Sequence, residues 1–393
     1  MPDTLIIVAS VVLLVAILSW IIPSGTYDYQ EMNINGRIRN VAIDGTYHTI
    51  DKSEVTTTGF LGFFSVLYRG CVEAADVIFM ILCCCGTFGV VVKTGAFHAG
   101  IGTILKKLKG KEILLVPIIM MIFGLGGSVF GMASEFYGFY PLIVGLGVAL
   151  GYDAMFGFAI IAVGEFVGFM GATLNPYSVG IAQTISGVEL YSGTGYRAIC
   201  FVIFMAISII YVMVYGRKIK KNPGASVVFG EKNIHAFDRD ELNEYSFTLK
   251  DGLVLLDVLV VLVVLMLGLI KWGWDFPQLC GLFLLMSMIA AAICKWSPNK
   301  WCSEFIDSAK TAMWGCILTG IAKAITVVMQ DAQIMDTVIY GLSNVLKNAP
   351  HAVSAQVMLV VQTLINFFIP SATGQASATM PIMAQLADII GVS

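Results

Sequence analysis

The sequence predicts an all-α polytopic membrane protein, and three observations support this fold class. Hydrophobic residues make up 58% of the chain and charged residues only 12%, whereas soluble domains contain about 45–50% and about 25%. Several uninterrupted apolar runs reach the roughly 20 residues that a helix needs to cross the hydrocarbon core. Two further apolar stretches are broken by glycine, proline and small polar residues, a pattern typical of re-entrant hairpins in transporters.

Composition and motifs also exclude other classes of protein. The net charge of −3 is close to neutral and indicates no nucleic-acid partner. The sequence contains no GxxxxGK[ST], HExxH or GxSxG motif, and its histidines lie outside the hairpins, so we expect no enzyme. The nine cysteines form no CxxC pair and are interpreted as small buried residues.

The order of the expected segments divides the chain into two halves. The first half (1–215) is expected to hold spans 4–22, 75–93 and 196–214, an outer excursion 23–74, a hairpin 112–150 and a broken helix 154–187. Residues 216–250 are expected to form a cytoplasmic linker, followed by a linking span 251–270. The second half (277–393) is expected to hold spans 277–294 and 311–329 and a hairpin 352–390.

Basic residues in short loops predict the orientation. Lysines cluster in LKKLKGKE (residues 105–112) and basic residues cluster in GRKIKKNP (residues 216–223). Because such clusters stay on the cytoplasmic side, we expect the N-terminus inside a bacterial cytoplasmic membrane. The first apolar stretch lacks a basic flank and is interpreted as a retained helix.

The two halves resemble each other. FGMASEFYGFYPLIVGLGVALGYD (130–153) aligns without a gap with PSATGQASATMPIMAQLADIIGVS (370–393), which matches Pro141 with Pro381 and Gly151 with Gly391. The linking span reverses the direction of the second half, so we expect an inverted structural repeat. The first half continues beyond its hairpin whereas the chain stops after the second, and we therefore expect a chain truncated at its C-terminus.

The hairpin tips are the candidate binding elements. Irregular backbone survives at membrane depth only where it faces protein or a water-filled cavity. The second tip, IPSATGQASATMP, carries no charge, and its Ser371, Thr373, Gly374 and Gln375 are expected to bind a small solute. The alternative is a kinked helix pair packed through small residues.

The first tip and the broken helix carry two acids. Glu135 follows Ser134 at the tip, and Glu165 lies in the broken helix. A carboxylate at membrane depth is costly and is a functional candidate by default, although Glu135 could also lie at the water boundary.

The broken helix is interrupted by GATLNPYS, residues 171–178. Pro176 removes a backbone donor and frees carbonyl groups, which together with Thr173, Asn175 and Ser178 are expected to form a cage of oxygen ligands for Na⁺. Lys323 is a lone cation in a crossing helix. It is expected to pair with one of the two acids, to contact a substrate carboxylate, or to extend to the membrane surface.

These motifs carry a resemblance to a known family. WIIPSGTYDY, FGMASEFYGFYPLIVGLGVALGYD, GATLNPYSVGIAQTISG and IPSATGQASATMPIMAQLAD resemble the C4-dicarboxylate anaerobic carrier-like family, in its YfcC-type branch of basic amino acid antiporters within the ion transporter superfamily. The resemblance implies a scaffold domain, a mobile transport domain that works as an elevator, and a homodimer in the lipid bilayer. It also implies a substrate between the two tips and ion ligands at Ser134, Thr173, Asn175 and Pro176, with Na⁺ at Ser134 and Asn175. Glu165, as a carboxylate at membrane depth, is expected to join these ion ligands.

Two departures from the family pattern bear on the substrate. Family members often carry two adjacent acids at the first tip, where this chain has Ser134 and Glu135, and often an arginine at the position of Lys323. We expect a secondary transporter without a cofactor, coupled to Na⁺ or H⁺ or acting by exchange, for a basic amino acid such as arginine or ornithine. The alternative is a Na⁺- or H⁺-coupled C4-dicarboxylate transporter.

Overall fold

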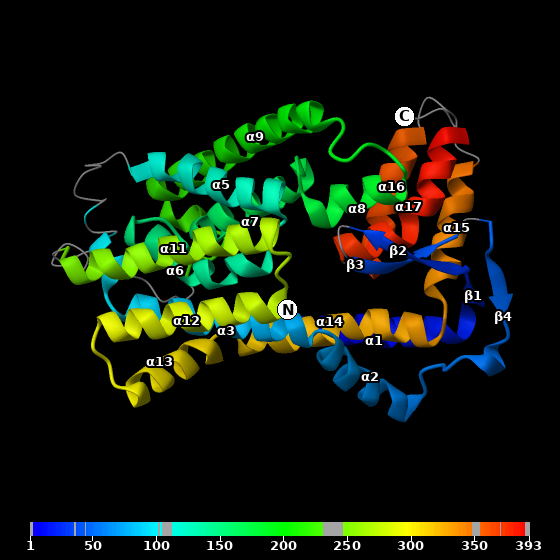
Figure 1. The fold of residues 1–393 in the computed structure, drawn as a ribbon, viewed down its shortest axis with the longest axis horizontal. Helices are drawn as coiled ribbons and strands as arrows, with labels where there is room; N and C mark the ends of the chain where they lie inside the picture. Colours follow the sequence, from blue (N-terminus) through cyan, green and yellow to red (C-terminus); the bar gives the residue numbers. More distant parts are fainter. Residues whose placement is uncertain are drawn as a thin grey trace. The chain divides into compact units, whose positions relative to one another are not determined.

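The computed structural model describes residues 3–34, 37–43, 45–100, 103, 112–230, 247–347, 354–369 and 371–389 (Figure 1). The helices of the described residues are α1 (Thr4–Ile21), α2 (Phe60–Glu73), α3 (Ala75–Lys93), α5 (Leu115–Leu125), α6 (Tyr140–Ala149), α7 (Ala154–Gly171), α8 (Ile181–Ile185), α9 (Thr194–Lys221), α11 (Leu249–Lys271), α12 (Phe276–Ile293), α13 (Pro298–Lys310), α14 (Met313–Asp331), α15 (Met335–Lys347), α16 (Ser354–Phe368) and α17 (Ala372–Ile389). The strands are β1 (Ser24–Thr26), β2 (Tyr29–Ile34), β3 (Arg37–Ala42) and β4 (His48–Ile50).

Six described helices are long and apolar enough to cross a membrane. They are α1, α3, α7, α9, α12 and α14. Each overlaps a span expected from the sequence, and α11 covers the expected linking span 251–270. The lysine cluster at 106–111 and residues 231–246 of the expected linker lie outside the described residues.

The excursion between α1 and α2 contains β-structure, which the all-α fold class did not include. β1 pairs antiparallel with β4, and β2 pairs antiparallel with β3, with Tyr29 opposite Ala42. The paired strands β2 and β3 contain aromatic and β-branched residues such as Tyr29 and Val41, which favour a pleated, half-buried surface. Two small two-stranded sheets therefore extend from an otherwise helical chain.

The chain forms two compact units. The first unit combines Met1–Ile78, Pro176–Ser192 and Gly315–Ser393, and the second combines Phe79–Asn175 and Gly193–Trp314. The boundaries of these units do not follow the two halves expected from the sequence, because the broken helix contributes to both. Its part up to Asn175 belongs to the second unit, and its part from Pro176 belongs to the first.

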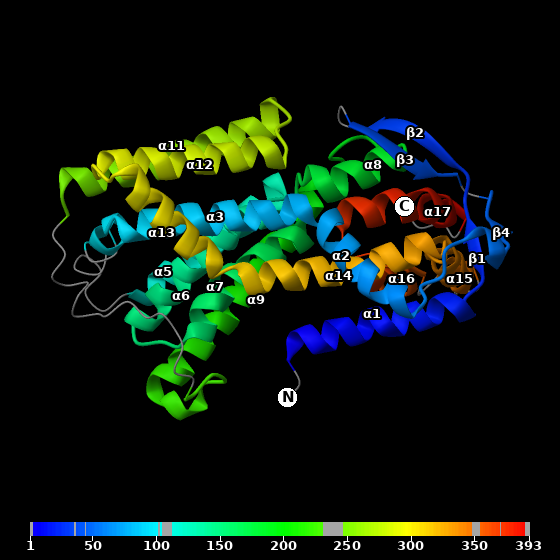
Figure 2. The ribbon, with the colours of Figure 1, turned by 90° about the horizontal axis from the view of Figure 1, so that it is seen from below.

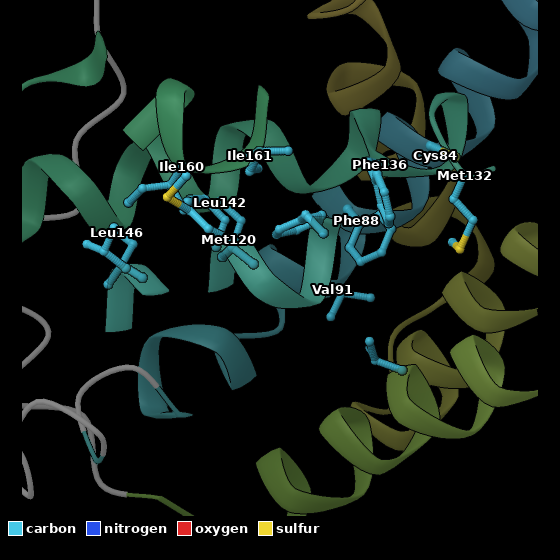
Figure 3. Close-up of a cluster of buried hydrophobic side chains, with 14 of the residues drawn as sticks. Cys84, Phe88, Val91, Met120, Met132, Phe136, Leu142, Leu146, Ile160 and Ile161 are labelled. Atoms are coloured by element: carbon cyan, nitrogen blue, oxygen red, sulfur yellow. The ribbon is translucent and has the colours of Figure 1, made fainter. Parts of the chain in front are cut away.

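In the second unit, α7 is the central helix, and α5 and α6 pack against it. The buried side chains around it include Met120 of α5, Leu142 and Leu146 of α6, and Ile160 and Ile161 of α7 (Figure 3). Phe88 of α3 is also fully buried in this cluster. This apolar packing fixes the hairpin arms around the helix that carries Glu165.

Glycines allow α5 and α7 to approach closely. A Cβ atom added at Gly168 would lie 2.2 Å from the carbonyl oxygen of Gly124, and one at Gly164 would lie 2.9 Å from that of Met120. The later residue of α7, Gly168, lies against the later residue of α5, Gly124, so α5 and α7 run in the same direction. α6 runs in the opposite direction, because Gly157 lies against Val144 whereas the earlier Asp153 lies near Gly147.

In the first unit, the excursion docks onto α15 and α17. Asp336, in the first turn of α15, accepts hydrogen bonds from the Tyr29 hydroxyl at 2.8 Å, the Tyr27 amide at 3.0 Å and the Thr26 hydroxyl at 3.1 Å. β3 and α8 both lie against α17, where Val41, Ile181 and Ala376 form a buried apolar cluster (Figure 2). The excursion is therefore an integral part of the unit that holds the second hairpin.

Candidate functional site

The predicted helix break is present after α7. α7 ends at Gly171, and Ala172 adopts a left-handed conformation with φ of 35° and ψ of 56°. The helix resumes with a π-helical turn at Pro176–Gly180, followed by α8. The left-handed residue redirects the chain, so residues 172–175 form an irregular segment between two helical pieces.

This irregular segment is bonded to the first hairpin. α5 is extended by a π-helical turn, Gly126–Phe130, which contains Ser128. The hydroxyl oxygens of Ser128 and Thr173 lie 3.0 Å apart, and the Thr173 amide donates to Ser128 Oγ at 3.1 Å. The Asn175 amide group donates to the carbonyl oxygen of Gly127 at 3.2 Å. The structure thus brings Thr173 and Asn175 together at the first hairpin, where Thr173 bonds to Ser128, a residue that the sequence analysis missed, and Asn175 bonds to Gly127.

The carbonyl groups of the break accept hydrogen bonds from α9. Arg197 Nε donates to the Ala172 carbonyl oxygen at 3.1 Å, and Arg197 Nη2 donates to that of Thr173 at 3.2 Å. The Thr194 hydroxyl also donates to the Thr173 carbonyl oxygen, at 3.3 Å. Two of the carbonyl groups expected to be free for Na⁺ therefore already have donors from this chain.

Glu135 lies in a tight turn at the first tip. Residues Ser134–Phe139 form a 3-10 helix, and Glu135 accepts a hydrogen bond from the Ala133 amide at 2.9 Å. Phe136 packs edge-on against Phe123 of α5, with ring centroids 4.8 Å apart. Burial leaves Glu135 only 9% exposed, so the tip carries a carboxylate that is largely removed from solvent.

Glu165 is the second buried carboxylate of this unit. It lies in α7, is 4% exposed, and accepts a hydrogen bond from the Tyr140 hydroxyl at 3.1 Å. Tyr140 begins α6, so the donor comes from the second arm of the first hairpin. Both acids are thus bonded to neutral donors, an amide and a phenol, which solvate a carboxylate without neutralising its charge.

The second tip lies between two helices. α16 ends at Phe368, and α17 runs unbroken from Ala372 to Ile389. The Gly374 amide donates to Ser371 Oγ at 3.2 Å, and the Gln375 amide donates to the Ser371 carbonyl oxygen at 2.7 Å. The expectation of an extended irregular tip was wrong, because the helix continues through Pro381. Ser371 caps its first turn.

Amide groups connect the two arms of the second hairpin. Gln375 Nε2 donates to the backbone oxygen of Gln362 at 2.8 Å and to its side-chain oxygen at 2.6 Å. Gln362 Nε2 in turn donates to the Thr379 hydroxyl at 3.1 Å, and Thr379 is 1% exposed. Gln362 was not predicted, although its position in an apolar helix facing the polar tip is the signal that could have indicated it.

An open groove lies beside this amide network. Its volume is about 510 Å³, and it is lined by Gln362, Thr363, Asn366, Phe367 and Gln375. Among the described residues, the lining consists of amides, a hydroxyl and an aromatic ring and includes no charged side chain. Such a surface can exchange hydrogen bonds with a polar solute and cover its apolar part.

The remaining predicted residues are placed as follows. Lys323 lies half-buried in α14, within the first unit, whereas Glu135 and Glu165 belong to the second. The side chains of Ser134, Pro176 and Thr373 lie outside the described residues. No group of three His, Cys, Asp or Glu side chains gathers as metal ligands in the described part of the chain.

Membrane-crossing helices, a broken helix and two hairpins with buried polar groups define a membrane transporter, and comparison with known proteins agrees. The chain belongs to the DcuC family, described as C4-dicarboxylate anaerobic carriers, whose model matches residues 1–393.

Two relatives match the whole chain. One is the "Putative basic amino acid antiporter YfcC" of Escherichia coli, which is 31% identical over 428 residues that cover all of this chain and 84% of the relative. The other is an uncharacterized protein of Haemophilus influenzae, 28% identical over 433 residues, also with 84% of its length covered.

Two solved structures are more distant neighbours. The YdaH transporter of Alcanivorax borkumensis is 13% identical with a TM-score of 0.45, and the match covers all of this chain and 84% of that one. MtrF of Neisseria gonorrhoeae, described as representing a class of antimetabolite efflux pumps, is 15% identical with a TM-score of 0.44, and the match covers 98% and 81%.

Proposed function

We propose that this transporter carries a basic amino acid such as arginine or ornithine across the bacterial cytoplasmic membrane, with its N-terminus inside. The observation that carries this proposal is the pair of buried acids, Glu135 and Glu165, each held by a neutral donor. A buried charge is costly unless it is paired. A cationic substrate that arrives at these acids supplies the missing charge.

The second hairpin is proposed to bind the other end of the substrate. The α-carboxylate would lie against Ser371, Thr373, Gly374 and Gln375, at the N-terminus of α17, because the first turn of a helix attracts anions. Ser134 and Asn175, which belong to the same unit as Glu135, are proposed as further substrate-binding residues. The E. coli relative, whose name describes a putative basic amino acid antiporter, would then share this class of substrate.

Movement is proposed to follow an elevator mechanism. Two hairpins related by an inverted repeat would form a transport domain that moves against a scaffold domain, within a homodimer. The broken helix supports this proposal, because Thr173 and Asn175 bond to the first hairpin while α8 lies against α17 of the second.

The second candidate is a Na⁺- or H⁺-coupled C4-dicarboxylate transporter. The family description favours it, as do the uncharged amide groove and the lone cation Lys323. In this version Na⁺ would be held by Ser134 and Asn175, with Thr173, Pro176 and Glu165 nearby, and Lys323 would contact a substrate carboxylate. An anionic substrate is harder to reconcile with two buried acids.

Uptake into proteoliposomes separates the two candidates. Radiolabelled arginine is expected to accumulate against an ornithine gradient, whereas succinate and fumarate are expected not to. Glu135→Gln removes the charge while keeping the shape, so arginine uptake should fall by about tenfold or more, since loss of a buried charge pair costs more than about 1.4 kcal/mol.

Glu189→Gln is the matched control, because Glu189 is an exposed acid outside both hairpins. Its arginine uptake should equal that of the wild type. Rapid succinate uptake, or arginine uptake unaffected by Glu135→Gln, would overturn the assignment of a basic amino acid.

A further inference from the structure

We infer that Arg197 is a built-in cation of the α7 break, and that the guanidinium group takes the place that a Na⁺ ion would occupy at the carbonyl groups of Ala172 and Thr173. Four hydrogen bonds carry this inference. Besides its bonds to these two carbonyl oxygens at 3.1 and 3.2 Å, Arg197 donates to the Thr194 hydroxyl at 3.2 Å, and that hydroxyl donates to the Thr173 carbonyl oxygen at 3.3 Å.

The chemistry of this cluster is that of a cation site. Two backbone carbonyl groups and one hydroxyl are hard oxygen ligands, of the kind that bind Na⁺ in transporters with broken helices. They also lie at the C-terminal end of α7, where the helix dipole is negative and favours a positive charge. The guanidinium carries a permanent charge and offers several N–H donors in a fixed plane. The guanidinium can therefore donate hydrogen bonds to both carbonyl groups at once.

The position of Arg197 in the chain explains how it reaches the break. Gly193 has a positive φ of 71°, which turns the chain into α9, and Arg197 follows in the first turns of that helix. Thr194 and Arg197 are three residues apart and share one helix face. The first turns of α9 thus present a hydroxyl and a guanidinium together to the end of α7.

The consequence reaches the first hairpin. Arg197 holds the backbone of Thr173, whose amide and hydroxyl bond to Ser128, and the neighbouring Asn175 bonds to Gly127. Arg197 is therefore a positioning residue for the hairpin that carries Glu135. Because its charge is part of the chain, this break should keep its geometry without Na⁺.

Removal of the guanidinium should create a cation site that the wild type does not have. In Arg197→Ala the carbonyl groups of Ala172 and Thr173 lose the hydrogen bonds that Arg197 donates, while the Thr194 hydroxyl still donates to Thr173, so a small cation can enter. Thermal unfolding of the purified full chain in detergent is the first readout, with NaCl, choline chloride or dilute guanidinium chloride at constant ionic strength. The wild type is expected to unfold at the same temperature in NaCl and choline chloride. Arg197→Ala is expected to unfold at a lower temperature and to regain part of the loss in NaCl or millimolar guanidinium.

Transport supplies a second readout, which rests on the proposed function. Arginine uptake by the wild type should be unchanged when choline replaces Na⁺. Arg197→Ala should reduce uptake by about tenfold, as expected for a lost bond to a charged group, and guanidinium should restore part of it. Arg197→Lys keeps the charge and should retain more uptake than Arg197→Ala. Because the unfolding experiment needs no substrate, a wrong substrate assignment would affect only the uptake experiment.

Arg217→Ala is the matched control, since Arg217 is an exposed arginine near the other end of α9. Its unfolding should show no specific response to guanidinium or Na⁺. Two results would overturn the inference. In the first, Na⁺ raises the unfolding temperature of the wild type relative to choline, and Arg197→Ala shows the same increase. In the second, the unfolding temperature of Arg197→Ala responds to neither Na⁺ nor guanidinium. If Arg197→Ala does not fold, Arg197→Gln takes its place, and the response of the wild type to Na⁺ still decides the question.

Discussion

The hydroxyl oxygens of Ser128 and Thr173 lie 3.0 Å apart and join the first hairpin to the broken helix. Ser128 also accepts a hydrogen bond from the Thr173 amide, so one buried serine satisfies two groups of an irregular segment. Since buried backbone donors need partners, this contact allows α7 to break where it does.

Ser128→Ala should therefore destabilise the protein. The Thr173 amide would be left buried without its acceptor, which costs about 1–3 kcal/mol, and thermal unfolding in detergent should begin at a lower temperature. Ser10→Ala is the control, because Ser10 is exposed on α1 and bonds only within its own helix. If Ser128→Ala and Thr173→Val have fully additive effects, the two side chains are not coupled and this interpretation fails.

Tyr140→Phe should impair the site at Glu165 while leaving the fold intact. The change removes the hydroxyl that donates to Glu165 at 3.1 Å, and a hydrogen bond to a charged group is worth about 1.5–3 kcal/mol. We expect arginine uptake to fall by about tenfold, measured as initial rates in proteoliposomes. Tyr137→Phe is the matched control, since Tyr137 stacks on Tyr140 at 6.2 Å but is 39% exposed. Equal rates for both variants would show that the Tyr140 hydroxyl has no role.

Gly168→Ala should be strongly destabilising. The added Cβ would lie 2.2 Å from the Gly124 carbonyl oxygen, so α5 and α7 would have to separate, and such overpacking costs about 1–3 kcal/mol or more. Yield and unfolding temperature after detergent extraction measure the effect. Gly281→Ala, in α12, adds the same methyl group with no atom within 4 Å and should be neutral. A stable Gly168→Ala protein would contradict the close approach of the two helices.

Asp336→Asn should loosen the excursion from α15. Burial, and then the nearby charge of Asp336, raise the pKa of Tyr29 above its ordinary value. In the unfolded chain the pKa of a tyrosine is about 10. Because folding raises the pKa of Tyr29, the protonated phenol contributes its full share of the folding stability below a pH of about 10, and that share is lost as the pH rises further. The phenol therefore remains a donor at physiological pH.

Asparagine keeps only one acceptor oxygen for the three donors, so limited proteolysis should cleave the excursion faster in Asp336→Asn than in the wild type. The exposed Asp28 provides the control Asp28→Asn, which should be cleaved at the wild-type rate. Resistance of Asp336→Asn to proteolysis would show that the apolar contacts around Tyr27 and Ala42 are sufficient to hold the excursion.

Much of this architecture follows from the sequence alone. Long apolar runs determine the crossing helices, because a polar backbone can enter hydrocarbon only when a helix satisfies it. GATLNPYS determined the break after α7, since Pro176 cannot donate a hydrogen bond and Gly171 permits the preceding helix to end. The acids Glu135 and Glu165 stood out by their charge in apolar surroundings.

The partners of these residues were decided by the tertiary structure. Ser128, Tyr140, Gln362 and Arg197 are ordinary residues in the sequence, and they acquire a role only because folding places them beside Thr173, Glu165, Gln375 and Ala172. The prediction of irregular backbone at the second tip, made from its polar residues and Pro381, was wrong, because α17 is a continuous helix. The sequence specifies which groups must be buried, because burial depends on the hydropathy of each segment. Which donor satisfies each buried acceptor depends on distances between residues far apart in the chain, and only the packed structure fixes those distances.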